Sequence, residues 1–174
     1  MTRTIPTRHP ELRIGMTMAD LSTCTPSGRL HFSPNPADGK DMNRNYKPAG
    51  HTAVSPFLLV SDAAAMLDFL RAAFDAIELC RVSAPDGSIK HAEVRLGDSI
   101  VMVGERAHAI ACSVHVYVPD VDGTFHQGLA AGACSIVEPR NLAYGDRSAG
   151  LRDPQGNLWW IGTHVGTRPA ANEA

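Results

Sequence analysis

Long hydrophobic runs are missing from this chain of 174 residues. None of its apolar stretches approaches the ~20 residues that a membrane-spanning helix needs. Residues 1–30 also lack the continuous apolar segment of a secretory signal. These absences predict a soluble, cytoplasmic protein without a membrane partner.

Basic clusters are missing as well. The chain has 16 Lys and Arg residues against 18 Asp and Glu residues, a formal net charge of −2, and no stretch rich in Lys or Arg. Nucleic acids and anionic membranes are bound through concentrated positive patches. The charge pattern therefore speaks against nucleic acid as a partner and favours a small-molecule ligand.

Several catalytic signatures are absent. The sequence has no G-x-S-x-G nucleophile elbow, no glycine-rich phosphate loop and no H-E-x-x-H metal motif. Cys24, Cys80, Cys112 and Cys134 are scattered and form no C-x-x-C pair, so we interpret them as reduced thiols and not as a zinc or disulfide framework. Any site must be assembled from dispersed residues.

The chain divides into three parts. Residues 1–48 are rich in Pro, Thr, Ser, Asn and Arg and show no sustained period, which predicts a poorly ordered N-terminal extension. Residues 49–165 have 3.6-residue and two-residue hydrophobic periods and form the predicted domain. Residues 166–174 are expected to be a short C-terminal tail.

The first half of the domain, residues 53–105, has the pattern of a β-α-β-β-β module. Its predicted helix follows Ser61-Asp62, which can cap it, and places Met66, Leu67, Leu70 and Phe74 on one face. The predicted elements are strands at 55–60, 77–82, 89–96 and 99–103 and a helix at 63–74.

The second half, residues 112–164, repeats the same order. The predicted elements are strands at 113–118, 133–137, 148–152 and 158–163 and a helix at 121–131, with the last two strands joined by a type I turn at 153–156. Trp159 and Trp160 are neighbours in the last strand and must point to opposite faces of the sheet. One of them should pack in the core and the other should line the open face.

Short motifs along residues 47–164 resemble the vicinal oxygen chelate superfamily, which groups glyoxalases, bleomycin-resistance proteins and extradiol dioxygenases. The motifs are YGDR, DPQG with the tryptophan pair, KPAGHTAVSPFLLV, DFLRAAF, PDGSIKHAEVRLGDSIVM, HVYVPDVD and GLAAGA. Within the superfamily they are similar to the glyoxalase-like, phosphonate-operon-protein-like subgroup. The resemblance implies an α+β fold in which two β-α-β-β-β modules form a paired, curved mixed sheet around a cavity, with the helices outside. It also implies a homodimer.

In metal-dependent members of that superfamily, ligands come from the first and fourth strands of each module. Aligning the motifs places Ser55, Met102, Ser113 and Trp160 at these positions. Two hydroxyls, a thioether and an indole are poor ligands for Zn²⁺, Ni²⁺ or Fe²⁺. We therefore expect no metal or other cofactor, and the remaining metal alternative is a displaced site built from His115, His91 and Glu93.

Strand alternation also yields acid–base candidates. His115 and Tyr117 share the face of Ser113, and His91 and Glu93 lie opposite the apolar face of their own strand. His115, with Glu93 or His91, forms the candidate catalytic set, because imidazole and carboxylate groups titrate usefully near neutral pH. The alternative interpretation is that these polar residues are only the solvated face of a sheet.

The candidate ligand-binding residues are mostly aromatic or small, and all except Tyr144 and Arg147, which precede the last hairpin, share the predicted open face. They are Ser55, Phe57, Met102, Ser113, Tyr117, Tyr144, Arg147 and Trp160. Arg147 could clamp a carboxylate or phosphonate, or could pair with Asp146 or Asp153.

Three functions follow from this set. The favoured one is a binding protein that holds, and possibly sequesters, a small organic molecule in a metal-free cavity. The first alternative is a metal-independent isomerase or lyase that uses His115. The second is a glyoxalase or dioxygenase dependent on a divalent metal.

Overall fold

A computed structural model describes residues 46–166. The predicted N-terminal extension before residue 46 and the tail after residue 166 lie outside these residues, as does Cys24. The ordered elements follow the predicted sequence of two β-α-β-β-β modules, and the α+β class is confirmed.

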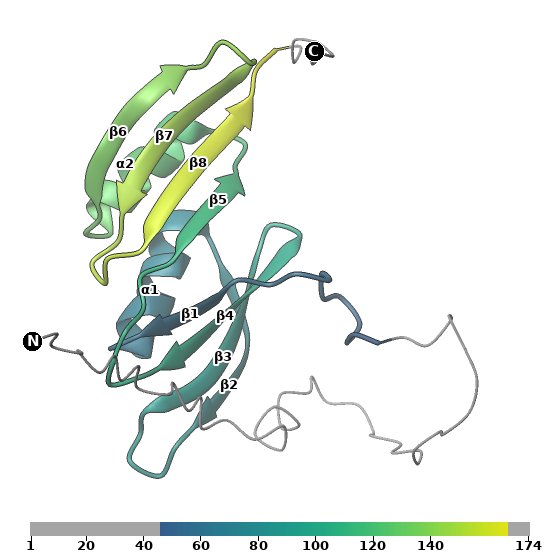
Figure 1. The fold of residues 1–174 in the computed structure, drawn as a ribbon, viewed down its shortest axis with the longest axis vertical. Coiled ribbons are helices and arrows are strands. Elements are labelled where there is room, and N and C mark those ends of the chain that lie inside the picture. Colours follow the sequence, from purple (N-terminus) through teal and green to yellow (C-terminus); the bar gives the residue numbers. More distant parts are fainter. Residues whose placement is uncertain (1–45, 167–174) are drawn as a thin grey trace, which may run out of the picture.

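The first module contains β1 (Phe57–Val60), α1 (Ala63–Phe74), β2 (Ile77–Ser83), β3 (Ile89–Leu96) and β4 (Ser99–Glu105). The second contains β5 (Ser113–Tyr117), α2 (Val121–Ala130), β6 (Cys134–Asn141), β7 (Asp146–Arg152) and β8 (Leu158–His164). Figure 1 shows the modules one above the other. Neither helix of the described chain is long and apolar enough to cross a membrane.

Each module forms its own four-stranded mixed sheet, with strand orders β1-β4-β3-β2 and β5-β8-β7-β6. In both sheets the first and last strands pair in parallel and the other pairs are antiparallel. The registers correspond, since Phe57 lies opposite Met102 in the first sheet and His115 lies opposite Trp160 in the second. The sequence predicted a repeat from the order of helices and strands, and the structure shows that the two modules also repeat the register of their paired strands.

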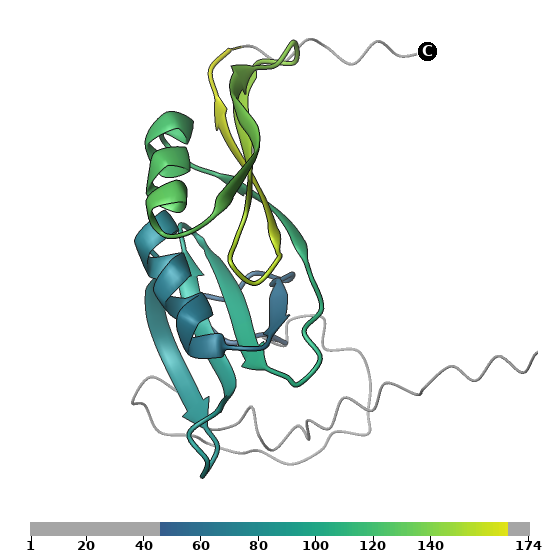
Figure 2. The same ribbon diagram turned by 90° about the vertical axis from the view of Figure 1, so that its left-hand side faces the viewer.

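Helix α1 begins where the sequence predicts. Asp62 has an extended backbone, and its side chain accepts a hydrogen bond from the backbone N–H of Ala65 at 2.9 Å. The helix ends at Asp75, whose φ of 53° places it in the left-handed region. The helices follow one another along the same side of the molecule (Figure 2) and contact each other.

The two modules share one hydrophobic core. Trp159 is fully buried, and its ring lies 4.9 Å from that of Phe74 and 6.4 Å from that of Phe69, both on α1 of the other module. The turn before β8 also touches α1, because the side-chain oxygen of Gln155 accepts hydrogen bonds from the backbone N–H groups of Ser61 and Asp62. The last hairpin thus fixes the second module against the first.

Several strand ends differ from prediction by one to four residues, and the largest difference, at the end of β6, has a local reason. The first strand begins at Phe57 and not at residue 55, and β6 continues to Asn141 beyond the predicted end at residue 137. β6 contains Pro139, and its pairing with β7 shifts register between Val137 and Arg140. A bulge on an edge strand is where proline is tolerated within a sheet.

Candidate functional site

The open face of the second sheet, opposite α2, carries a row of aromatic and small residues. His115, Trp160, Gly150 and Val137 lie side by side across the four strands. Trp160 is partly exposed, and its indole N–H donates to the hydroxyl of Ser113 at 3.2 Å. Trp159 points the other way into the core, as strand alternation predicts.

Glycines let these rings lie flat on the sheet. A Cβ on Gly150 would come within 2.8 Å of the Trp160 ring, and a Cβ on Gly162 would come within 3.1 Å of the His115 ring. The ring of Tyr117 lies 4.8 Å from that of His115. His115 and Trp160 are register partners that line one pocket, and Tyr117 contacts His115. These three rings on one face of the sheet are called the aromatic floor.

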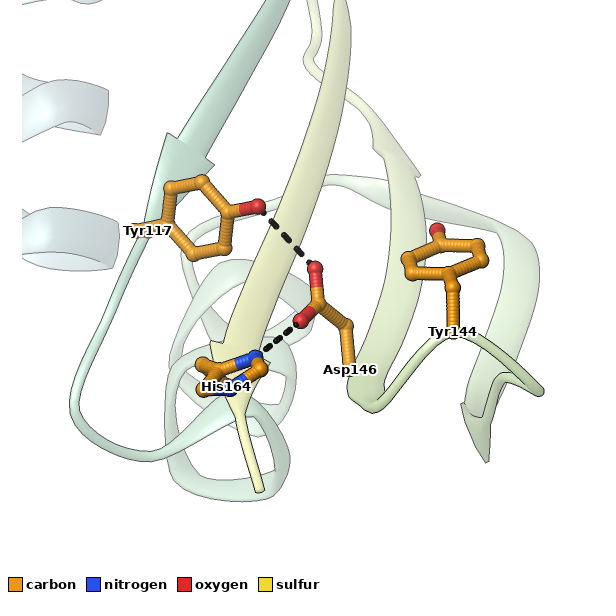
Figure 3. Close-up of a pocket in the computed structure, with 4 residues that line it drawn as sticks. All are labelled: Tyr117, Tyr144, Asp146 and His164. Carbon is orange, nitrogen blue, oxygen red and sulfur yellow. Dashed lines mark hydrogen bonds and ion pairs between the residues drawn. The ribbon is translucent and has the colours of Figure 1, made fainter. Parts of the chain in front are cut away.

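Two pockets open over this face. One, of about 690 Å³, is lined by Tyr117, Tyr144, Asp146 and His164 (Figure 3). The other, of about 250 Å³, includes His115, Arg140, Tyr144 and Trp160 among its lining residues. Because Tyr144 lines both, the two pockets adjoin each other.

The larger pocket contains a hydrogen-bonded set that sequence reasoning missed. Asp146 accepts a hydrogen bond from the Tyr117 hydroxyl at 3.0 Å and pairs with Nδ1 of His164 at 2.8 Å (Figure 3). The hydrogen bond from His164 holds the pKa of Asp146 below its ordinary value; burial opposes this shift, and Tyr117 adds to it. The last predicted strand ended at residue 163, but His164 is the last residue of β8.

Replacing Asp146 with Asn is expected to change how stability depends on pH. Because the pKa of Asp146 is lowered in the folded protein, its contribution is present above the unfolded value of about 3.9 and is lost as the pH falls through the lowered value. The difference in unfolding free energy between wild type and Asp146→Asn should therefore be largest near neutral pH and should shrink as the solution is acidified below about pH 4. Urea unfolding across that range measures it, and a difference independent of pH would contradict the assignment.

Arg147 does not face the pockets. Its guanidinium donates two hydrogen bonds to Asp122 on α2, at 2.5 and 2.6 Å, and a third to Asn141 at 3.2 Å. It therefore pairs with neither Asp146 nor Asp153, the two partners that the sequence suggested. This placement on the helix side of β7 gives no support to a ligand clamp.

The open face of the first sheet carries a different, more enclosed set. Glu93 pairs with His51 at 3.0 Å and lies 3.4 Å from Nε2 of His91. His91 is buried, its Nδ1 has no hydrogen-bond partner among residues 46–166, and its ring packs edge-on against Phe57 at 5.8 Å. His51 precedes β1 and was not singled out by the sequence.

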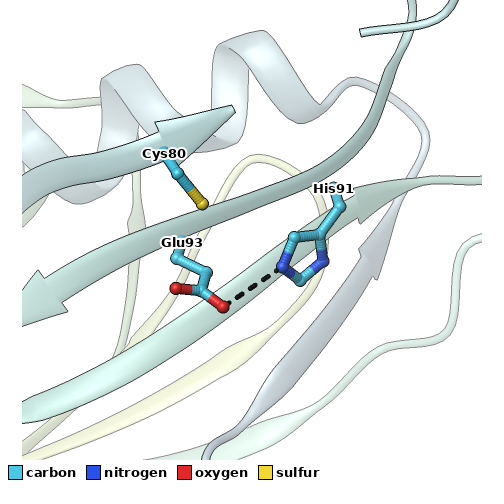
Figure 4. Close-up of side chains that lie close together, drawn as sticks. All are labelled: Cys80, His91 and Glu93. Atoms are coloured by element: carbon cyan, nitrogen blue, oxygen red, sulfur yellow. Dashed lines mark hydrogen bonds and ion pairs between the residues drawn. The ribbon is translucent and has the colours of Figure 1, made fainter. Parts of the chain in front are cut away.

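Cys80, His91 and Glu93 come close together (Figure 4), but Cys80 is disulfide-bonded and offers no thiolate, so this group of three has only two donors left for a metal. This also corrects the interpretation of Cys80 as a reduced thiol, whereas Cys112 and Cys134 are free.

The superfamily ligand positions fit a metal no better. The Trp160 indole N–H is a donor engaged with Ser113, and Ser55 lies 3.5 Å from the hydroxyl of Thr52. Met102 offers only a thioether from β4, opposite Phe57. We derive no metal-dependent step from this donor set.

The predicted site residues thus fall into two groups. Ser55, Phe57, Met102, His91 and Glu93 belong to the first sheet or its approach, whereas Ser113, His115, Tyr117, Tyr144 and Trp160 belong to the second. Within residues 46–166, no hydrogen bond or ring contact joins His115 to Glu93 or His91. The acid–base set predicted from sequence is therefore not assembled within one chain.

Comparisons with known proteins place this geometry in context. No family model matches the sequence. The chain is 34% identical over 152 residues to the uncharacterized protein Rv0887c of Mycobacterium tuberculosis strain H37Rv, an alignment that covers 79% of this chain and 85% of that protein.

Among solved structures, the chain is similar to TioX from Micromonospora sp. ML1. The two share 30% identity and a TM-score of 0.57, over 66% of this chain and 98% of TioX. A glyoxalase/bleomycin resistance protein/dioxygenase family enzyme from Burkholderia phytofirmans PsJN shares the fold, with a TM-score of 0.52, 22% identity, and coverage of 64% of this chain and 96% of that one.

Proposed function

Because the chain belongs to the glyoxalase/bleomycin resistance/dioxygenase superfamily, we propose that it binds a small, planar organic molecule on the open face of its second sheet. The aromatic floor is the observation that carries this proposal. Gly150 and Gly162 provide the space in which the Trp160 and His115 rings lie against the sheet. Flat ligands gain most from such surfaces, since aromatic rings bury large apolar areas and stack in offset or tilted arrangements.

We also propose that this binding needs no metal. The donor set at the superfamily ligand positions contains no carboxylate or imidazole, which are the ligands that divalent ions prefer. The same absence weakens the alternative of a metal-dependent glyoxalase or dioxygenase. Membership of the chain in the phosphonate-operon-protein-like subgroup remains a prediction.

A second copy of the chain is the proposed partner that completes the cavity. Each helix packs on one face of its own sheet, and no further helix of residues 46–166 covers either of the other faces. A homodimer would bring an open sheet of one chain over an open sheet of its partner. The mass of the protein in solution, measured by light scattering, tests this.

The acid–base alternative has less support than binding. An isomerase or lyase using His115 with Glu93 or His91 requires groups that lie on different sheets of one chain, so only a partner chain could bring them together. The open second sheet, by contrast, has a complete aromatic surface within one chain. We therefore propose binding and sequestration as the function.

Trp160 provides the readout for this proposal. Titration with 2-naphthoate or with bleomycin should quench tryptophan fluorescence saturably in the wild type, because Trp160 is exposed on the floor whereas Trp159 is buried. In Trp160→Phe the same titration should leave the remaining fluorescence almost unchanged. Saturable quenching of equal size in Trp160→Phe, or none in the wild type with either probe, would argue against the proposed surface.

A further inference from the structure

The larger pocket contains three polar side chains, Tyr117, Asp146 and His164, that a purely aromatic surface does not require. Asp146 is 5% exposed, although it lies at the start of β7 beside solvent. Both of its carboxylate oxygens are engaged, one by the Tyr117 hydroxyl and the other by His164. The carboxylate thus orients two neighbours and leaves no oxygen directed at a ligand.

Hydrogen bonding to Asp146 defines the state of the His164 ring. An ionised carboxylate only accepts hydrogen bonds, so Nδ1 of His164 carries the proton of this bond. Nε2 makes no hydrogen bond within residues 46–166, and the ring lines the pocket (Figure 3).

A second cation lies over the adjoining pocket. Arg140 stands opposite Ser148 on the same open face, lines the smaller pocket, and has no ion pair in the described part of the chain. The two adjoining pockets thus hold Asp146, whose carboxylate oxygens are both engaged, together with His164 in the larger pocket and Arg140 in the smaller one. Such a pocket attracts an anionic oxygen, because hydrogen bonds from cations to anions are about twice as strong as neutral ones.

We propose that the larger pocket recognises an acidic oxygen of the planar ligand. This oxygen belongs to a carboxylic acid or a phenol. Nε2 of His164 takes up one proton, from the O–H of a phenol or, for a carboxylate that is already ionised at neutral pH, from solvent. It then donates this proton in a hydrogen bond to the ligand's anionic oxygen. His164 is the binding residue, Asp146 is its positioning residue, and Arg140 adds positive charge. This inference rests on the proposed function, since the ligand's ring lies on the aromatic floor.

Two probes with the same ring test it. 2-Naphthoate carries the acidic oxygens, and 2-acetylnaphthalene replaces them with a neutral methyl ketone of similar shape. At neutral pH the wild type should bind 2-naphthoate about tenfold more tightly, as expected for one charge-assisted hydrogen bond. His164→Gln should reduce this ratio to near one while retaining affinity for 2-acetylnaphthalene.

The control is His126→Gln, because His126 is an exposed histidine on α2 outside both pockets. It should keep the wild-type ratio. Arg140→Gln should lower the ratio by a smaller factor than His164→Gln. Thermal unfolding of each variant checks that the fold is kept.

Asp146 requires a readout that a purely structural role would not change. Nitrogen NMR of His164 should show both ring nitrogens protonated in the wild-type complex with 2-naphthoate. In Asp146→Asn, which keeps the shape but removes the charge, the doubly protonated signal should diminish and the probe ratio should fall.

The outcomes separate the two proposals. Equal affinity of the wild type for both probes, or an affinity ratio that is unchanged in His164→Gln, overturns the recognition of an acidic oxygen. Either result is still compatible with binding on the aromatic floor. If neither probe binds, the proposed function and this inference fall together.

Discussion

Trp159→Ala is expected to lower the free energy of unfolding by about 3–5 kcal/mol, the usual cost of emptying a large buried aromatic site. Trp159 has no exposed surface and packs against Phe69 and Phe74 on α1. These contacts join the two modules, so the cavity would open in the core that they share. A domain of this size is stable by only about 5–15 kcal/mol, and the variant should therefore be close to its stability limit.

Trp160→Ala is the matched control, one residue away on the opposite face. It removes the same side chain from a partly exposed position, so its effect on unfolding should be much smaller. It should instead abolish the binding of 2-naphthoate. Urea unfolding of both variants gives the comparison, and equal losses of stability would contradict the assignment of Trp159 to the core.

Asp153→Ala is expected to destabilise the protein by about 3 kcal/mol or more, because it leaves several buried donors without an acceptor. Asp153 is 3% exposed. Its carboxylate accepts hydrogen bonds from the backbone N–H groups of Gln155 and Asn157, from the Asn157 amide and from the Trp159 indole, at 2.8 to 3.0 Å. These bonds fix the turn that carries Gln155 to the start of α1.

Asp86→Ala is the control for this prediction. Asp86 also lies in a turn between two strands, but it is exposed, and it accepts hydrogen bonds from the backbone and side chain of Ser88. Its loss should be tolerated, since solvent can satisfy the exposed donors. A large loss of stability from Asp86→Ala, or a small one from Asp153→Ala, would show that burial of the turn carboxylate does not govern the effect.

The sequence predicted the fold well because its signals are local. Apolar residues at helical spacing after Asp62 gave the bounds of α1 that the structure shows. The residues Asp-Pro-Gln-Gly gave the last turn, and alternation correctly placed Trp159 and Trp160 on opposite faces. The arrangement of the two modules depends on contacts between residues far apart in the sequence. It was predicted only from the resemblance to the superfamily.

Asp146 and His164 were missed as site residues because the two predicted strands of the last hairpin were too short. The turn places Arg152 opposite Leu158, and continuing the same register brings Asp146 opposite His164. We ended the arms at residues 148 and 163, which hid this pair. The same alternation places Arg147 on the face opposite Asp146, so its partnership with α2 could also have been predicted.

The contacts among His51, His91 and Glu93 on the first sheet could not be predicted from the sequence for a different reason. His51 lies before β1, in a segment without strand or helix period, so nothing in the pattern relates it to Glu93 on β3. Contacts between an irregular segment and a distant strand depend on the folded path of the chain. The disulfide at Cys80 was likewise hidden by the wide spacing of the cysteines.

A crystal structure of the protein with bound 2-naphthoate tests the central claim most directly. We expect the naphthalene ring on the aromatic floor, against Trp160 and beside His115, with the carboxylate directed toward His164. Arg140 should lie at the end of the ligand that carries the carboxylate. A ring bound against Phe57 and Met102 on the first sheet, with the floor of the second sheet unoccupied, would contradict the account.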